Sequence, residues 1–357
     1  MANPGSKPIA LALQGGGSHG AFTWGVLDRL LEEETLEIIG VTGTSAGAMN
    51  AVCLADGLAR GGREEARRRL ASFWNAVGEM PGVGRLLGWL PGDTLAHMRL
   101  DQTPPFVVLD AVRRNLTPDQ YNPLQTNPLR DALTQIIDFD RLRTADTIVQ
   151  VCATNVKTAR RRVFSNEDIS VDAVVASATL PDLFPAVEID HEKYWDGGYS
   201  GNPAMVGLIQ RLPKCDFIIV RIDPINRKDM PSDARGIQDR VTELAFNTTF
   251  WMELSALGVI MRFVEDGIVD RERFGRILFH CIQASDQLEK IPHSTKLNNA
   301  ENFLTFLFDL GRRTADQWLA EHGEDIGRRA TLDLTTLLPA VPPERLSPAV
   351  TGMTAHA

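Results

Sequence analysis

One stretch of the sequence decides the fold: Ile38-Ile39-Gly40-Val41-Thr42-Gly43-Thr44-Ser45-Ala46-Gly47. It begins as a short apolar run of the kind found in buried parallel strands. Glycines at positions 43 and 47 then enclose a turn, and residues 48–59 have the composition of a helix. We therefore expect a strand over residues 38–42, a tight turn around Ser45 and a helix after it.

The preceding residues follow the same order of strand, turn and helix. Residues 9–14 form another short apolar run, which ends at Gly15, Gly16 and Gly17. Over residues 21–34, apolar side chains recur at helical spacing with acidic residues on the opposite face. The first sixty residues thus predict a βαβα unit, and such units build parallel sheets covered by helices. We expect an α/β fold.

The rest of the chain is expected to extend this core within one domain. We expect a flexible N-terminus, a catalytic α/β core interrupted by a helical cap, a mainly helical C-terminal extension and a loose tail. These segments are residues 1–7, 8–225 with the insertion 60–145, 226–330 and 331–357. Further strands are expected at residues 147–156, 162–165, 187–189, 193–195, 217–222 and 276–282.

Composition narrows the class of protein. The 357 residues are 43% hydrophobic, which suffices for a sizeable core and excludes a disordered or fibrous chain. A net charge of −9 repels phosphate backbones, so we expect no nucleic-acid partner. The four cysteines lack metal-ligand spacing and indicate buried thiols in a reducing compartment, so we expect no metal and a cytoplasmic location. We find no signal-peptide core and no uninterrupted membrane span.

Ser45 carries the clearest chemical signal. The pattern Gly43-x-Ser45-x-Gly47 between a strand and a helix is that of a nucleophile elbow, in which a strained turn presents the serine hydroxyl. The hydroxyl then lies at a helix N-terminus, where developing negative charge is stabilised. The alternative is a glycine-rich turn in which Ser45 only caps the helix.

The glycine loop Gly15-Gly16-Gly17-Ser18-His19-Gly20 has two functional interpretations. Its glycines fit the dinucleotide fingerprint, which would indicate an NAD(P)-dependent oxidoreductase. That fingerprint needs an acidic residue at the end of the second strand, where this chain has Gly43 and Ser45. In a serine hydrolase, the same open loop would aim backbone N–H groups at the oxyanion.

A nucleophilic serine needs a base within hydrogen-bond reach. Among the seven histidines, His19 lies in the glycine loop and His191 at a predicted hairpin tip, and the others have no catalytic context. Asp196 ends an apolar run and precedes Gly197 and Gly198, which would expose its carboxylate. Taken alone, an Asp-Gly-Gly sequence is typical of a simple turn.

Taken together and in this order, the three motifs resemble those of the patatin-like phospholipase family. The glycine loop, the Ser45 elbow and the Asp196-Gly197-Gly198 turn carry the resemblance, which covers about residues 8–225. It implies a three-layer α/β/α fold with a mainly parallel central sheet. It also implies a catalytic dyad of Ser45 and Asp196, which uses no histidine and no cofactor.

The resemblance also assigns roles to the glycines. The backbone of Gly15, Gly16 and Gly17 would form the oxyanion hole, and the supporting motif glycines are Gly20, Gly43, Gly47, Gly197 and Gly198. The family usually has Arg or Lys where this chain has His19, so a fixed positive charge is missing at that position.

The expected activity is that of a lipid acyl hydrolase of the phospholipase A, lysophospholipase or carboxylester type. Its partners would be a lipid or ester substrate and, peripherally, a membrane or lipid surface; the oligomeric state stays open. The apolar segment of residues 83–90, together with Trp74, fits either a lipid-facing lid or a core-facing helix end. We favour the core-facing helix end. Besides the oxidoreductase, a non-catalytic protein of lipid-body or polyester-granule surfaces remains an alternative.

Overall fold

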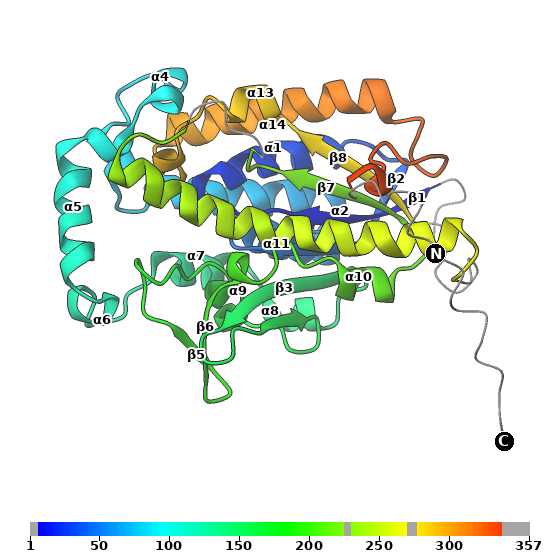
Figure 1. The fold of residues 1–357 in the computed structure, drawn as a ribbon, viewed down its shortest axis with the longest axis horizontal. Coiled ribbons are helices and arrows are strands. Elements are labelled where there is room, and N and C mark those ends of the chain that lie inside the picture. The colour runs from blue at the N-terminus through cyan, green and yellow to red at the C-terminus, as the bar shows by residue number, and fades with distance from the viewer. Residues whose placement is uncertain (1–5, 225–229, 270–276, 338–357) are drawn as a thin grey trace, which may run out of the picture.

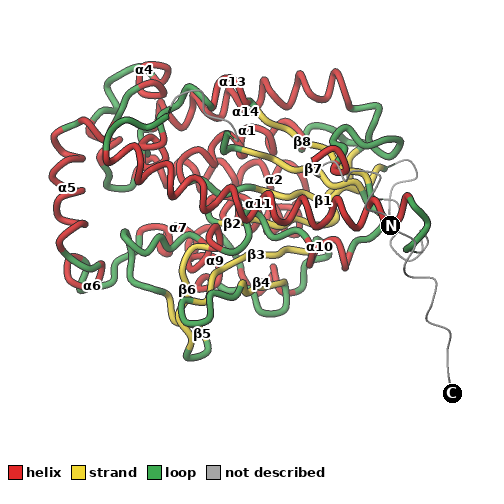
Figure 2. Tube along the Cα trace, in the orientation of Figure 1, coloured by secondary structure: helices red, strands yellow, loops and turns green. Residues whose placement is uncertain are grey.

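The computed structural model describes residues 6–224, 230–269 and 277–337. An eight-stranded sheet lies at its centre, and helices pack on both faces of that sheet (Figure 1, Figure 2). The strands are β1 (Lys7–Leu13), β2 (Leu36–Thr44), β3 (Ile148–Asn155), β4 (Arg161–Ser165), β5 (Val187–Ile189), β6 (Glu192–Asp196), β7 (Asp216–Arg221) and β8 (Leu278–Gln283).

The helices occupy most of the remaining described chain. The α-helices are α1 (Gly20–Leu30), α2 (Ala46–Glu79), α3 (Val83–Leu86), α4 (Gly92–His97), α5 (Pro104–Asn115), α6 (Pro118–Tyr121), α7 (Pro128–Ile136), α8 (Phe139–Arg143), α9 (Val171–Ser177), α10 (Val206–Arg211), α11 (Ala234–Glu265), α13 (Ser285–Leu288) and α14 (Glu301–His322). The 3-10 helices are η1 (Gly17–His19), η2 (Leu100–Gln102), η3 (Gly197–Tyr199), η4 (His293–Leu297) and η5 (Leu334–Leu337).

The sheet is mainly parallel, as predicted. Its hydrogen-bonded order is β5-β6-β3-β2-β1-β7-β8, and β4 also pairs with β3. Strands β3, β2, β1, β7 and β8 run parallel to one another. The antiparallel pairs involve β4, β5 and β6, on the side of β3.

The alternating directions of the side chains along β1 explain why helices cover both faces of the sheet and form three layers with it. Ile9, Leu11 and Leu13 point into a core that they share with α1, α2 and α14. Ala10 and Ala12 point to the opposite face, into a core shared with α10 and α11. Because successive side chains of a strand face opposite sides, one buried strand serves both cores. The predicted α/β/α class is confirmed.

Several predicted boundaries differ from the observed ones. The helix expected at residues 48–59 continues to Glu79 across a kink at Gly61 and Gly62, because apolar residues on its far half also reach the core. Lys7, expected to be flexible, already pairs with β2. Leu334, expected in a loose tail, is buried against α11 and β8. Residues 1–5 and 338–357 of the predicted termini lie outside the described residues.

Helix α11 is long and apolar enough to cross a membrane by length and composition. Phe250, Leu254 and Leu257 on this helix are nevertheless buried in the core beneath the sheet. These side chains of α11 are therefore part of the protein core.

Helices α1 and α14 cross at very close range. A Cβ on Gly25 of α1 would overlap the carbonyl oxygen of Phe308, and one on Gly311 of α14 would overlap that of Phe22. Both contacts are with backbone atoms, which cannot rotate away as a side-chain end can. The two glycines therefore fix α14 against the N-terminal part of the fold.

We predict that Gly311→Ala lowers the free energy of unfolding by about 2–4 kcal/mol, because α14 must move away from α1 and lose packing. Urea unfolding followed by circular dichroism measures this loss. The matched control is Gly78→Ala in α2, where the nearest atom to a Cβ lies at an ordinary 3.7 Å. Alanine's higher helix propensity should make that control neutral or slightly stabilising. Equal effects of the two substitutions would contradict the close crossing.

Candidate active site

Ser45 lies at the sharp turn between β2 and α2. Its φ of 55° and ψ of −124° are unusual for a residue with a side chain. Gly43 and Gly47 make the turn possible: a Cβ on Gly47 would overlap the carbonyl oxygen of Leu13, and one on Gly43 would overlap that of Gly47. Such backbone strain persists only where the surrounding structure enforces it. The strained turn expected around Ser45 is present.

The Ser45 hydroxyl does not cap helix α2. Ser45 is the N-cap residue, yet its side chain makes no capping hydrogen bond. Its N–H donates to Ser177 Oγ at 2.9 Å, which anchors the turn from α9. The capping interpretation is therefore wrong, and Oγ lies at a helix N-terminus that favours negative charge.

Strands β2 and β6 meet end to end on one edge of β3. Thr44 at the end of β2 pairs with Cys152, and Asp196 at the end of β6 pairs with the next residue, Ala153. Strand β4 occupies the other edge of β3 at both positions, so β2 and β6 must share this one. A Cβ on Gly197 would lie 3.0 Å from Thr44 Cγ2, which places the two strand ends in contact. Ser45 and Asp196 are thereby brought together.

The Asp196 carboxyl group is fully buried. One oxygen, Oδ1, accepts the N–H of Gly198 at 2.8 Å. The other oxygen, Oδ2, has no hydrogen-bond partner among the described residues. The Ser45 hydroxyl is nevertheless near enough to the carboxyl group to lower its pKa. The two side chains therefore lie near each other without a close hydrogen bond to Oδ2.

Burial raises the pKa of Asp196 to about 7, and this is the largest effect on it. The Gly198 N–H, the Ser45 hydroxyl and the charge of Lys296 each lower that pKa, but by less than burial raises it. A carboxyl group that titrates near neutral pH is far more basic than an ordinary aspartate. It can accept and return a proton at pH 7.

The glycine loop runs directly beside the Ser45 turn. A Cβ on Gly15 would lie 2.5 Å from the Thr44 carbonyl oxygen and 2.7 Å from Ser45 Cβ, so only glycine fits there. The N–H of Gly15 donates to Asn202 Oδ1 at 2.7 Å. Within the described part of the chain, the N–H groups of Gly16 and Gly17 donate no backbone hydrogen bond.

A sequence model described as patatin-like phospholipase matches residues 11–208, which is more than half of the chain and includes the loop, the elbow and Asp196. The chain belongs to the patatin-like phospholipase family. The predicted resemblance is thus confirmed, and the family supports lipid hydrolase activity in general.

Solved structures and curated proteins were compared as well. VipD from Legionella pneumophila is similar at 16% identity and a TM-score of 0.34, over 86% of this chain and 67% of that one. The ExoU-SpcU complex from the type III secretion system of Pseudomonas aeruginosa matches at 13% identity and a TM-score of 0.27, over 87% of this chain and 53% of that one. Among curated proteins, no match was found.

The histidines that we considered as alternative bases make contacts of their own elsewhere in the described structure. His19 is buried, with Nε2 2.8 Å from Thr295 Oγ1. The His191 side chain is fully exposed at the turn between β5 and β6. His280 Nε2 lies 3.0 Å from Asp216 Oδ2, at the opposite end of β7 from the glycine loop. Of the candidate bases, Asp196 is the one that the fold brings to Ser45.

The sequence did not predict a role for four residues around the patatin-like site. Ser177 accepts from the Ser45 N–H, and Asn202 accepts from the Gly15 N–H. Lys296 and Asp223 form an ion pair beside the glycine loop. Asn202 follows the Asp-Gly-Gly turn by only a few residues, whereas nothing in the sequence links position 296 to the loop.

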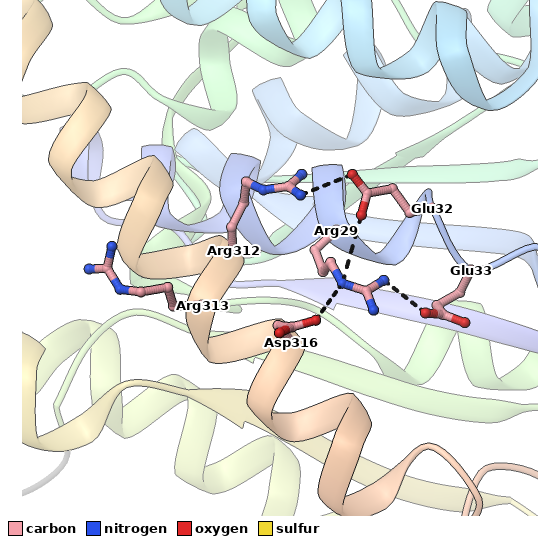
Figure 3. A pocket seen from close by; sticks show the side chains of 6 residues that line it. All are labelled: Arg29, Glu32, Glu33, Arg312, Arg313 and Asp316. Atoms are coloured by element: carbon pink, nitrogen blue, oxygen red, sulfur yellow. Dashed lines mark hydrogen bonds and ion pairs between the residues drawn. The ribbon is translucent and has the colours of Figure 1, made fainter.

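A polar groove lies away from this site, between α1 and α14 (Figure 3). Its charged side chains neutralise one another: Arg29 pairs with Glu33 at 2.8 Å and with Asp316 at 2.9 Å, and Arg312 pairs with Glu32 at 2.9 Å. The pairs of Arg29 with Asp316 and of Arg312 with Glu32 link α14 to α1 and the turn after it, and none of the three pairs shares a residue with the Ser45 site. Among the described residues, no cluster of three or more His, Cys, Asp or Glu is arranged to hold a metal ion.

We predict that Asp196→Asn stabilises the folded protein at pH 8. The folded pKa of about 7 exceeds that of an unfolded aspartate, about 3.9, so ionising Asp196 costs folding free energy as pH rises. The advantage of the asparagine variant should be absent below about pH 4, grow up to about pH 7, and then stay at roughly 2–4 kcal/mol.

Urea unfolding of both proteins at a series of pH values measures this difference. The exposed Asp119→Asn serves as the matched control and should leave stability unchanged at every pH. If Asp196→Asn and wild type were equally stable at pH 8, Asp196 would not be a buried group of raised pKa.

Proposed function

We propose that the protein is a serine-dependent lipid acyl hydrolase that works through Ser45 and Asp196. One observation carries this proposal. Ser45, whose backbone is strained and whose side chain does not cap α2, lies next to the fully buried carboxyl group of Asp196, whose pKa is about 7. Both features cost folding free energy, and backbone strain and raised pKa values typically occur at catalytic sites.

The reaction takes two similar halves. Asp196 accepts the proton of Ser45 as Oγ forms a bond to the ester carbonyl carbon. The bond from that carbon to the leaving oxygen then breaks, and Asp196 returns the proton to the departing alcohol or lysolipid. Water repeats the cycle on the acyl-enzyme, releases the fatty acid and restores Ser45.

The glycine loop supports the oxyanion in this proposal. The N–H groups of Gly16 and Gly17 are the donors to the negatively charged oxygen, because they are not engaged by backbone acceptors of the described chain. Gly15 has a different part: its N–H is held by Asn202, which fixes the loop beside Ser45.

Family membership favours this hydrolase over the dinucleotide interpretation of the glycine loop. We further propose that the substrate is a lipid or simple ester reached at a membrane or lipid surface from the cytoplasm. The favoured core-facing interpretation of residues 83–90 is wrong for Leu86 and Trp89, which are exposed at 64% and 78%. These two side chains would meet that surface, whereas Trp74 is buried and belongs to the core. A non-catalytic granule protein remains one outcome of the test.

We predict that Ser45→Ala and Asp196→Asn each lose at least about a hundredfold in rate while remaining folded, because each removes one half of the proton transfer. The assay compares p-nitrophenyl esters of graded chain length with phospholipid vesicles. Ser232→Ala and Asp119→Asn, both at exposed positions, are the matched controls and should keep full activity.

Full activity in either site variant would refute the dyad. Binding of wild type to lipid or polyester granules without any ester hydrolysis would instead support the non-catalytic alternative.

We also predict that kcat/KM falls as the pH drops through about 7. Asp196 accepts a proton only when it is ionised, and its pKa of about 7 sets the midpoint of that loss. A pH series with a short p-nitrophenyl ester measures the midpoint. Activity that stayed constant down to pH 5 would be inconsistent with Asp196 as the base.

A further inference from the structure

The 3-10 helix η4 packs directly over the glycine loop. A Cβ on Gly17, whose φ is 59°, would overlap the carbonyl oxygen of Lys296, and it would lie 3.4 Å from the Lys296 Cβ. Thr295, the preceding residue, contacts the ring of His19. Lys296 lies some 90 residues beyond the part of the chain that the family model matches, so the fold alone brings it to this site.

The ammonium group of Lys296 is held by a buried carboxylate. Its Nζ lies 2.5 Å from Asp223 Oδ1, and the Asp223 side chain is almost fully buried. Among the described residues, no hydrogen-bond donor other than this ammonium reaches the Asp223 carboxylate. Since a buried charge is costly without a partner, the pair fixes both side chains.

Asp223 is itself fixed to the glycine loop. Gln14, the residue before the loop, accepts the N–H groups of Ile222 and Asp223 at 2.9 Å each. A Cβ on Gly16 would lie 3.7 Å from Asp223 Oδ1. The ion pair therefore lies beside Gly16 and Gly17, the two residues whose N–H groups are unengaged.

Lys296 is also the charge that acts on Asp196. The ionisable side chains that interact with Asp196 in the described structure are Lys296, Cys152 and Tyr199. Burial raises the pKa of Cys152 to about 12 and that of Tyr199 beyond its usual range, so both are neutral at pH 7. The positive charge of Lys296 lowers the pKa of Asp196 and opposes the effect of burial.

We propose that Lys296 supplies the fixed positive charge of this active site, acting on the Asp196 carboxylate and on the oxyanion beside Gly16 and Gly17, and that Asp223 holds it there. This inference rests on the proposed function. Lys296 acts through its charge and bonds to no reacting atom, so it is a positioning residue. Both stages of the reaction build negative charge at this place, which a nearby cation favours.

The test uses Lys296→Met, Asp223→Asn, the double variant Asp223→Asn/Lys296→Met, and the exposed control Lys290→Met. The measurements are kcat and KM for a p-nitrophenyl ester at pH 7, the midpoint of the acidic limb of kcat/KM, and thermal unfolding. We expect Lys296→Met to lose roughly tenfold in kcat with little change in KM, and its midpoint to move to higher pH. The control should match wild type.

The double variant distinguishes an effect of the Lys296 charge from an effect of losing the partner of Asp223. Lys296→Met alone removes the ion-pair partner of the buried Asp223 carboxylate and can lose stability, since among the described residues only the charge of Arg221 then acts on that carboxylate. The double variant removes both charges of the pair together. If Lys296 acts by its charge, the double variant stays about tenfold slow with a raised midpoint. Asp223→Asn alone keeps the cation, so its midpoint should not rise. Recovery of wild-type kcat and midpoint in the double variant would overturn the proposal, because Lys296 would then only neutralise Asp223.

A readout without turnover distinguishes failure of this inference from failure of the proposed function. Titration of the Asp196 carboxyl carbon by 13C NMR, assigned with Asp196→Asn, reports its pKa even in a protein that hydrolyses nothing. A higher Asp196 pKa in the double variant than in wild type supports the electrostatic role. An unchanged Asp196 pKa refutes it, whatever the activity assays give.

Discussion

The candidate site depends on the meeting of β2 and β6 on a single edge of β3. Two strands that run in opposite directions end at adjacent positions of a third, so the residues that follow them must face each other. Local turns then aim the side chains: strain presents Ser45, and the Gly198 N–H fixes one oxygen of Asp196. The sheet thus sets the distance between the two groups, and the turns set their orientation.

Burial gives this arrangement its chemistry. The layers on both faces of the sheet exclude water from the carboxyl ends of its central strands, and desolvation is the main cause of the raised pKa of Asp196. The same desolvation strengthens every charge interaction nearby, so one cation on η4 acts on Asp196 and lies beside the glycine loop. Stability and reactivity are therefore opposed at Asp196.

The sequence predicted what depends on local pattern and missed what depends on long-range packing. Glycines at 15, 43, 47 and 197 mark close backbone approaches that no other residue permits, which is why the three motifs could be found without a structure. The full length of α2 was missed because Gly61 and Gly62 resemble a helix end. Lys296 was missed because an isolated lysine in a loop has no pattern, and only the docking of η4 gives it a role.

The close crossing of α1 and α14 has a consequence for how this chain is divided. Helix α14 starts four residues after η4, and its glycine contact with α1 keeps η4 seated on the loop that leads into α1. The segment that carries the family's motifs, residues 8–225, and the segment that contains η4 and α14 therefore depend on each other for their packing. A chimera that joined residues 8–225 to the C-terminal half of a distant relative would retain every recognisable motif and still lack the Lys296–Asp223 ion pair beside the glycine loop.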